Sequence, residues 1–170
     1  LFGREQQAKA FFDAQAAHIE PILEKEKTGL SVAFFAVASD GTITVRKPND
    51  YVSSMIELAG GTYSLNGYVP EEENALSTLK MQMEDFYAAE KDADILIYNG
   101  TIEGELTSID ELVQKNSLFA DFKAVKTGQV YTTGSNFYQQ TSGTCDFIED
   151  LNKVLNGETD AEYRFLKKIN

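Results

Sequence analysis

Apolar residues recur at helical spacing over the first part of the chain. From Arg4 to Lys27 the sequence predicts a long amphipathic helix, because charged residues separate a regular series of apolar ones: Ala8, Phe11, Phe12, Ala16, Ile19 and Leu23. Pro21 removes one internal hydrogen bond, so we expect it to bend or break this helix near its end. The next stretch, from Leu30 to Ala38, is almost continuously apolar, which is typical of a strand buried on both faces.

A hairpin is expected after this strand. Asp40 and Gly41 tolerate the positive φ angles of a tight turn, and residues 42–46 alternate between polar and apolar as a half-buried strand does. Pro48 fits the first turn of a following helix, where a missing N–H costs little. A second hairpin strand and a second helix therefore follow the first strand.

The remaining elements alternate between strands and helices. Ser108 and Glu111 form a capping-box pattern at the start of one helix, and Thr159 with Glu162 predicts the start of the last one. The acidic run 71–73 is expected in a polar loop, as is the Gly/Ser/Thr-rich segment 134–143. The predicted helices cover residues 51–59, 83–91, 109–115 and 145–155, and the predicted strands cover residues 62–65, 95–98 and 129–132.

This alternation predicts a three-layer α/β/α sandwich with a mainly parallel central sheet. In open sheets of this kind, ligands bind outside the carboxyl ends of the strands, where loops converge. The segments after Ala38, Tyr98 and Thr132 are therefore the expected place for a binding site.

Composition narrows the classes of function. The chain has 170 residues, of which 42% are hydrophobic, enough for one domain with a real core. Its 27 acidic and 15 basic residues give a formal net charge of −12, which argues against nucleic acid as a partner. No apolar run is long enough to span a bilayer, and the start of the chain lacks the apolar core of a signal peptide. If the protein is exported, its targeting segment is missing, and we expect the chain to be a piece of a longer one.

The sequence offers little catalytic chemistry. Its one histidine, His18, is expected on a solvated face of the first helix, which argues against a histidine-based triad. Cys145 is alone and is expected to be an inert thiol at a helix start. No glycine-rich phosphate loop follows a predicted strand, and the acidic run 71–73 reads as a solvated charge run. We therefore expect no catalytic residue, no metal site and no cofactor, with an α/β enzyme of unknown reaction as the alternative.

Four segments together resemble the carboxyl-terminal lobe of a known family. The family comprises the solute-binding proteins of ABC importers for iron-siderophores, haem and cobalamin. The segments with this resemblance are Gly3–Ala8, Glu57–Gly61, Met83–Tyr98 and Ala124–Tyr131.

The resemblance implies a two-lobed binding protein with its cargo in the cleft between the lobes. Residues 1–27 would be the long helix that connects the lobes, and residues 28–170 would be the carboxyl-terminal lobe, with the amino-terminal lobe absent from this chain. It further implies a monomeric, extracytoplasmic protein, periplasmic or anchored as a lipoprotein. Such a protein captures a metal chelate or corrinoid and delivers it to the ABC permease.

The resemblance also implies roles for individual residues. Glu84 matches the family's lobe-top glutamate, which docks into arginines of the permease. We expect Phe137 and Tyr138 to be an exposed pair that stacks on cargo, and Arg46 either to pair with an anionic chelate or to be a strand-end surface arginine. The full expected set of cargo contacts is Thr44, Arg46, Thr78, Tyr98, Asn99, Asn136, Phe137 and Tyr138.

Overall fold

The computed structural model describes residues 3–69, 76–158 and 161–170. The acidic run 71–73 and Thr159, both singled out in the sequence, lie outside the described residues. The helices are α1 (Glu5–Leu23), α2 (Tyr51–Leu58), α3 (Met83–Glu90), α4 (Ile109–Lys115), α5 (Lys123–Lys126) and α6 (Thr144–Leu155), with short 3₁₀ turns η1 (Ser117–Asp121), η2 (Phe137–Gln139) and η3 (Thr141–Gly143).

One mixed sheet forms the centre of the fold. Its strands are β1 (Ser31–Val37), β2 (Ile43–Arg46), β3 (Thr62–Tyr63), β4 (Thr78–Met81), β5 (Ile95–Tyr98), β6 (Val130–Thr133) and β7 (Leu166–Lys168). Their order is β4-β2-β1-β5-β6-β7, and β3 also pairs with β1. The pairings β1–β3, β1–β5 and β5–β6 are parallel, whereas β2, β4 and β7 join in antiparallel fashion at the edges. The parallel centre brings the carboxyl ends of β1, β5 and β6 to one side of the molecule.

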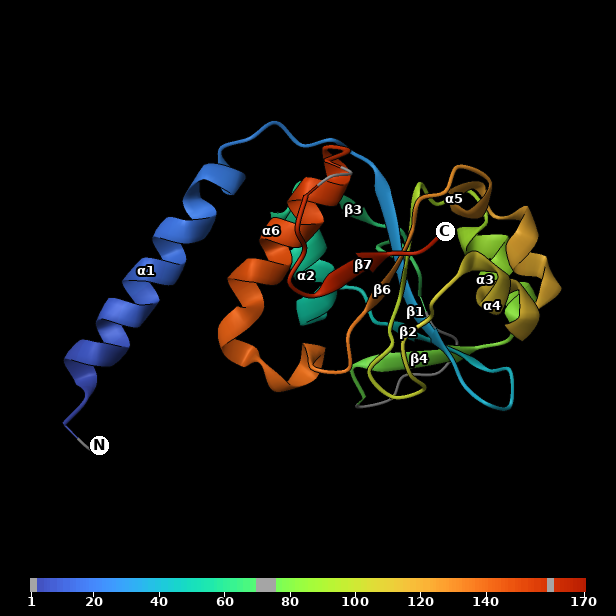
Figure 1. Cartoon of the computed structure of the whole chain (residues 1–170), viewed down its shortest axis with the longest axis horizontal. Coiled ribbons are helices and arrows are strands. Elements are labelled where there is room, and N and C mark those ends of the chain that lie inside the picture. Colours follow the sequence, from blue (N-terminus) through green and yellow to red (C-terminus); the bar gives the residue numbers. More distant parts are fainter. Residues whose placement is uncertain (1–2, 70–75, 159–160) are drawn as a thin grey trace.

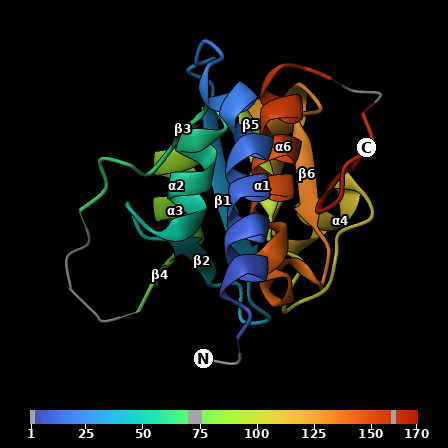
Figure 2. The same cartoon turned by 90° about the vertical axis from the view of Figure 1, so that its left-hand side faces the viewer.

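Helices cover both faces of this sheet, so the predicted three-layer α/β sandwich is confirmed (Figure 1). Helices α2 and α6 lie on one face, and α3 and α4 lie on the other. Helix α1 lies outside α6, as the view turned by 90° also shows (Figure 2). The contact with α6 is partly polar, because His18 of α1 reaches Glu149, and Lys25, just after α1, donates to the side chain of Asn152 at 2.7 Å.

The packing of strand β1 on both faces explains why its sequence is continuously apolar. Phe35 is fully buried and packs against Phe86 and Phe119, on the face covered by α3. Phe34, the residue before it in the strand, points to the other face and contacts Phe137 with ring centroids 5.9 Å apart. Both faces of the strand are thus buried by aromatic side chains, as the pattern predicted.

Two details at helix starts and ends differ from the predictions. Helix α1 contains Pro21 and ends at Leu23, so it is shorter than predicted. Pro48 lies outside α2, because Asn49 adopts a left-handed φ of 64° and Asp50 is the N-cap, whose carboxylate accepts from the N–H of Val52. The side-chain cap, rather than the proline, therefore fixes the start of α2.

The predicted last helix is wrong. The described residues after 160 continue into β7, an edge strand antiparallel to β6. The buried carboxylate of Asp150 on α6 accepts the backbone N–H groups of Arg164, Phe165 and Leu166, at 2.9, 2.7 and 3.2 Å. These three donors are held by a distant side chain, which favours an extended segment over a helix. Strand β4 is also absent from the strands that the sequence predicted.

Candidate functional site

A cavity of about 150 Å³ lies near the carboxyl ends of β1 and β5. We call it the polar cavity. Five of the residues expected to contact cargo line it together: Thr44, Arg46, Thr78, Asn99 and Tyr138. They come from β2, β4, the end of β5 and η2, which the sheet order brings side by side. The sequence did not single out its other lining residues, which are Phe34, Ala36, Ala38, Ile102 and Glu103.

Arg46 is held in place within the wall of this cavity. Its Nε donates to Asp50 Oδ1 at 2.8 Å, and its guanidinium carbon lies 4.7 Å from the ring centroid of Tyr51 and 5.4 Å from that of Tyr138. Only 8% of Arg46 is exposed, so the alternative of a surface arginine is wrong. Because Asp50 compensates the charge, the wall offers a fixed donor group rather than a free positive charge.

Asn99 connects the end of β5 to the loop after β6. It is buried, its Nδ2 donates to the hydroxyl of Tyr138 at 2.9 Å, and its Oδ1 accepts from the N–H of Thr101 at 3.2 Å. The next residue must be glycine, because a Cβ on Gly100 would lie 2.5 Å from the carbonyl oxygen of Thr133. This close approach of two backbones fixes the orientation of Asn99 at the cavity.

Three of the residues that were expected to contact cargo do not line the polar cavity. Tyr98 is fully buried and its ring packs edge-on against Phe35, away from the polar cavity. Asn136 is exposed and lies outside the lining of this cavity. Phe137 is only 8% exposed, so the expected exposed stacking pair is wrong: the tertiary fold buries this residue although its loop shows no periodicity.

A second cavity, of about 280 Å³, adjoins the first. We call it the aromatic cavity. Most of its wall is aromatic or apolar, and it shares Tyr138 with the polar cavity: the residues of this wall are Tyr51, Met55, Phe137, Tyr138, Phe147 and Phe165. Sequence reasoning singled out Phe137 and Tyr138 of this wall but missed the cavity, because the other wall residues come from α2, α6 and the segment before β7, where each one is typical of ordinary core.

Glu84 is exposed in the first turn of α3. A carboxylate at this place is favoured by the helix dipole and is free to meet a partner's cation. Its position is compatible with the docking role that the resemblance implies.

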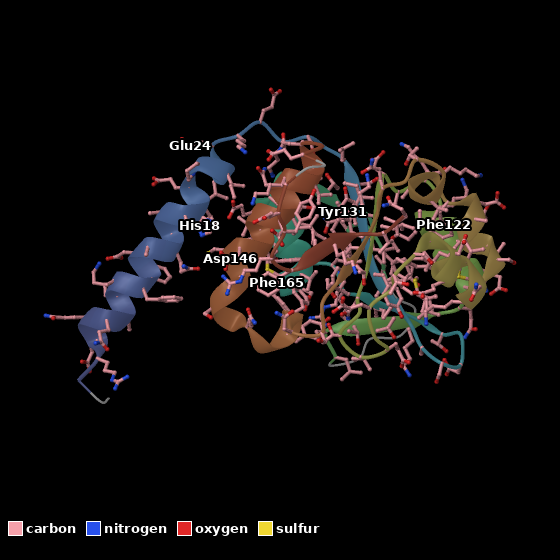
Figure 3. The ribbon with its side chains drawn as sticks, viewed as in Figure 1. His18, Glu24, Phe122, Tyr131, Asp146 and Phe165 are labelled. Carbon is pink, nitrogen blue, oxygen red and sulfur yellow. The ribbon has the colours of Figure 1, made fainter. Side chains whose placement is uncertain are left out.

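His18, Asp146 and Glu149 form a cluster between α1 and α6 whose potential metal ligand atoms lie within 4.8 Å of one another. Figure 3 shows His18 on α1 facing the helix that carries Asp146. His18 Nε2 lies 2.8 Å from Glu149 and the residue is only partly exposed, so the helix face that carries it is turned toward α6 and not, as expected, toward solvent. Both carboxylates are already paired, Asp146 with Arg164 and Glu149 with Lys153. The cluster is therefore a polar contact between the two helices.

Cys145 lies beside this cluster at the start of α6. Its Sγ lies 3.5 Å from the carbonyl oxygen of Gln15 on α1, and burial raises the pKa of the thiol. A thiol with a raised pKa carries less reactive thiolate at neutral pH, which agrees with the expected inert role.

Comparison with known proteins identifies the family. Residues 3–137 match the periplasmic binding protein family, and the chain belongs to it. The chain is also similar to an uncharacterized lipoprotein of Methanocaldococcus jannaschii, with 24% identity over 93% of this chain and 37% of that protein.

Solved structures show the same fold. A TroA-like periplasmic binding protein, FepB, from Veillonella parvula matches with a TM-score of 0.71 and 14% identity, over 99% of this chain and 58% of that one. An ABC-type Fe³⁺-hydroxamate transport protein from Saccharomonospora viridis matches with a TM-score of 0.70 and 17% identity, over 91% of this chain and 51% of that one. The periplasmic haem-binding protein HutB of Vibrio cholerae matches with a TM-score of 0.65 and 14% identity, over 91% of this chain and 57% of that one. This chain thus spans a little over half the length of these structures.

Family membership bears on the two classes that the sequence left open. The matching family model describes periplasmic binding proteins, which are a class of binding protein and not of enzyme. Within the part of the chain that the structure describes, no helix is both long and apolar enough to cross a membrane.

Proposed function

We propose that this chain is the cargo-binding lobe of an ABC-importer binding protein for a metal chelate, haem or a corrinoid. The observation that supports this most directly is the meeting of Thr44, Arg46, Thr78, Asn99 and Tyr138 around one cavity. The family resemblance implies these residues as cargo contacts, and they come from four separate segments. The cavity also lies where open α/β sheets bind their ligands.

The chemistry of the cavity suits a preformed complex rather than a bare metal ion. Hydroxyl, amide and guanidinium groups line it, and these donate hydrogen bonds to oxygen atoms of a ligand. Among the described residues that line it, Glu103 is the only carboxylate and none is histidine or cysteine. A transition-metal ion would need more such ligands, whereas a chelate arrives with its metal already coordinated.

In the proposed arrangement, α1 connects this lobe to a second lobe that closes over the polar cavity. Two exposed phenylalanines on α1 support this proposal, since 52% of Phe11 and 71% of Phe12 remain accessible on the described residues. Apolar surface of this kind is commonly covered by a partner. The cargo would then lie between the two lobes, and this lobe would supply one wall of the site.

Glu84 would deliver the loaded protein to its permease. An exposed carboxylate in the first turn of a helix can accept two parallel hydrogen bonds from an arginine of the partner. The proposed location is outside the cytoplasm, in the periplasm or at the membrane surface. It is supported by the family and by the similar lipoprotein.

The test is a binding screen of the full-length protein. The purified protein is incubated separately with ferric siderophores, haem and cobalamin, freed of unbound compound, and examined by absorbance spectroscopy and metal analysis. We expect one of these classes to remain bound in a 1:1 ratio. If all are removed with the unbound fraction, the proposed cargo classes are wrong.

A further inference from the structure

The walls of the aromatic cavity are rigid. Phe137 packs against Phe147, Tyr138 and Phe165, with ring centroids 4.5, 5.0 and 6.2 Å apart. Aromatic pairs at these separations are mutually stabilising, and large buried rings have little rotational freedom. The space between them is therefore a preformed cavity that cannot easily collapse.

A glycine shapes the end of this cavity at the start of α6. A Cβ on Gly143 would lie 2.5 Å from Cζ of Phe165, although the φ of this residue, −95°, is open to any amino acid. A side chain at this position would force the ring of Phe165 to shift, because the backbone approaches the ring closely. This approach holds Phe165 against the cavity and keeps the backbone before α6 in contact with it.

Among the described residues, those that line the cavity include no charged side chain. Gln140 and Thr144 add polar groups to its apolar wall, and the nearby Arg46 is neutralised by Asp50. Burial raises the pKa of Tyr51 to about 12, so its hydroxyl remains protonated and can donate a hydrogen bond. An anionic or cationic group would lose its hydration here without gaining a partner of opposite charge.

The mouth of the cavity opens beside the polar cavity. Tyr51 begins α2 and is 49% exposed, and Thr144 begins α6 and is exposed. Helix α6 follows the end of β6, and α2 leads into the start of β3, so both helices begin on the side where the parallel strands end. Tyr138 lines both cavities, so one ligand can reach into both.

We propose that the aromatic cavity binds an uncharged aromatic group of one or two rings, carried by the same cargo whose polar part lies in the polar cavity. The size supports this class: an apolar cavity of about 150 Å³ in another protein takes up benzene, and this one measures about 280 Å³. The proposal rests on the proposed function, to which it adds the kind of substituent that the cargo carries.

The experiment uses a probe for the cavity alone. Binding of 2-naphthol to the full-length protein is measured by calorimetry, for wild type, Thr144→Trp and Ala88→Trp. Thr144 is an exposed position at the mouth, so a tryptophan there would block entry without disturbing the core. Ala88 is an exposed position on α3, on the opposite face of the sheet, and serves as the matched control.

We expect one binding site for 2-naphthol, weakened about tenfold or more by Thr144→Trp and unchanged by Ala88→Trp. The saturated analogue decahydro-2-naphthol and the anion 2-naphthoate should bind at least about tenfold more weakly than 2-naphthol. Absence of 2-naphthol binding, equal binding to Thr144→Trp, or equal binding of 2-naphthoate would each overturn the proposal.

A second arm separates this inference from the proposed function. Chelates with and without an aryl substituent are titrated against wild type and Thr144→Trp. The proposal expects Thr144→Trp to weaken only the aryl-bearing chelates. If chelates bind and Thr144→Trp affects none of them, the inference fails and the proposed function stands. If 2-naphthol binds at the cavity but no chelate, haem or corrinoid does, the proposed function fails, together with the statement that the cargo carries the aromatic group.

Discussion

The amide of Asn99 donates to the hydroxyl of Tyr138 at 2.9 Å, although 39 residues separate them in the chain. Asn99 follows β5 at the centre of the sheet, and Tyr138 belongs to the η2 turn after β6. The bond attaches that turn to the sheet and sets the position of the ring between the two cavities. A single contact therefore shapes both parts of the candidate site.

Tyr138→Phe removes this bond and keeps the ring. We expect the free energy of unfolding to fall by about 1 kcal/mol, the usual net value of one such hydrogen bond. Cargo affinity should fall a few-fold, because Asn99 loses the group that orients it. Urea denaturation and cargo titration measure the two effects. Tyr163→Phe, which loses a bond to the carbonyl of Glu158, should change stability alone; loss of cargo affinity in that variant would contradict the local role of Tyr138.

Glu90 gives the fold a distinct dependence on pH. This residue is 1% exposed, and neither of its carboxylate oxygens has a hydrogen-bond partner among the described residues. Burial raises the pKa of Glu90 from 4.5 to about 7, and the nearby Ser64 hydroxyl only partly offsets the rise. The folded protein therefore holds this proton at pH values where the unfolded chain has released it.

This difference in bound protons sets the direction in which stability changes with pH. Between pH 4.5 and about 7 the folded state binds one more proton than the unfolded state, so the contribution of Glu90 to stability falls as pH rises. The loss over this window is about 3 kcal/mol. Urea denaturation across pH should show that Glu90→Gln lacks this loss, whereas Glu84→Gln, at an exposed position, follows wild type. Parallel profiles for wild type and Glu90→Gln would show that Glu90 titrates normally.

Phe137→Ala tests the burial of this ring. Because Phe137 contacts four other aromatic rings, its removal should lower the free energy of unfolding by about 3 to 5 kcal/mol. Val69→Ala, at a position 84% exposed, should change it by less than about 0.5 kcal/mol. A loss below about 1 kcal/mol for Phe137→Ala would instead support the exposed stacking residue that the sequence suggested.

Glu84→Ala tests docking separately from binding. We expect unchanged cargo affinity and reduced uptake by cells that carry the complete importer, since the role proposed for the carboxylate is to contact the permease and not the cargo. Asp110→Ala is the matched control, because Asp110 is also an exposed acid in the first turn of a helix. Equal uptake by wild type and Glu84→Ala would remove the docking role.

Local patterns were enough to predict most of the fold. The apolar run at β1, the hairpin to β2 and the capping box at α4 each depend on nearby residues, and the structure contains all three. The last segment was misread because its conformation depends on Asp150, which holds three backbone donors from more than ten residues away. Pairing at a sheet edge is set by such distant partners, and a local pattern does not reveal it.

Part of the candidate site could be predicted before the structure was known. The family resemblance implied Thr44, Arg46 and Asn99 as cargo contacts, and all three line the polar cavity. The aromatic cavity was not predictable, because Phe147 and Phe165 have the spacing of ordinary core residues. Only the packing of α2 against α6 shows that a space remains between these two helices.

The central claim is that cargo occupies the polar cavity. Its most direct test is an equilibrium titration of the full-length protein with the siderophore, haem or corrinoid that the screen retains, for wild type, Thr44→Phe and Thr62→Phe. Thr44 lines the cavity, whereas Thr62 is an exposed residue of β3 outside its lining. We predict saturable binding that Thr44→Phe weakens about tenfold or more and Thr62→Phe leaves unchanged. Equal affinity of wild type and Thr44→Phe would contradict the claim.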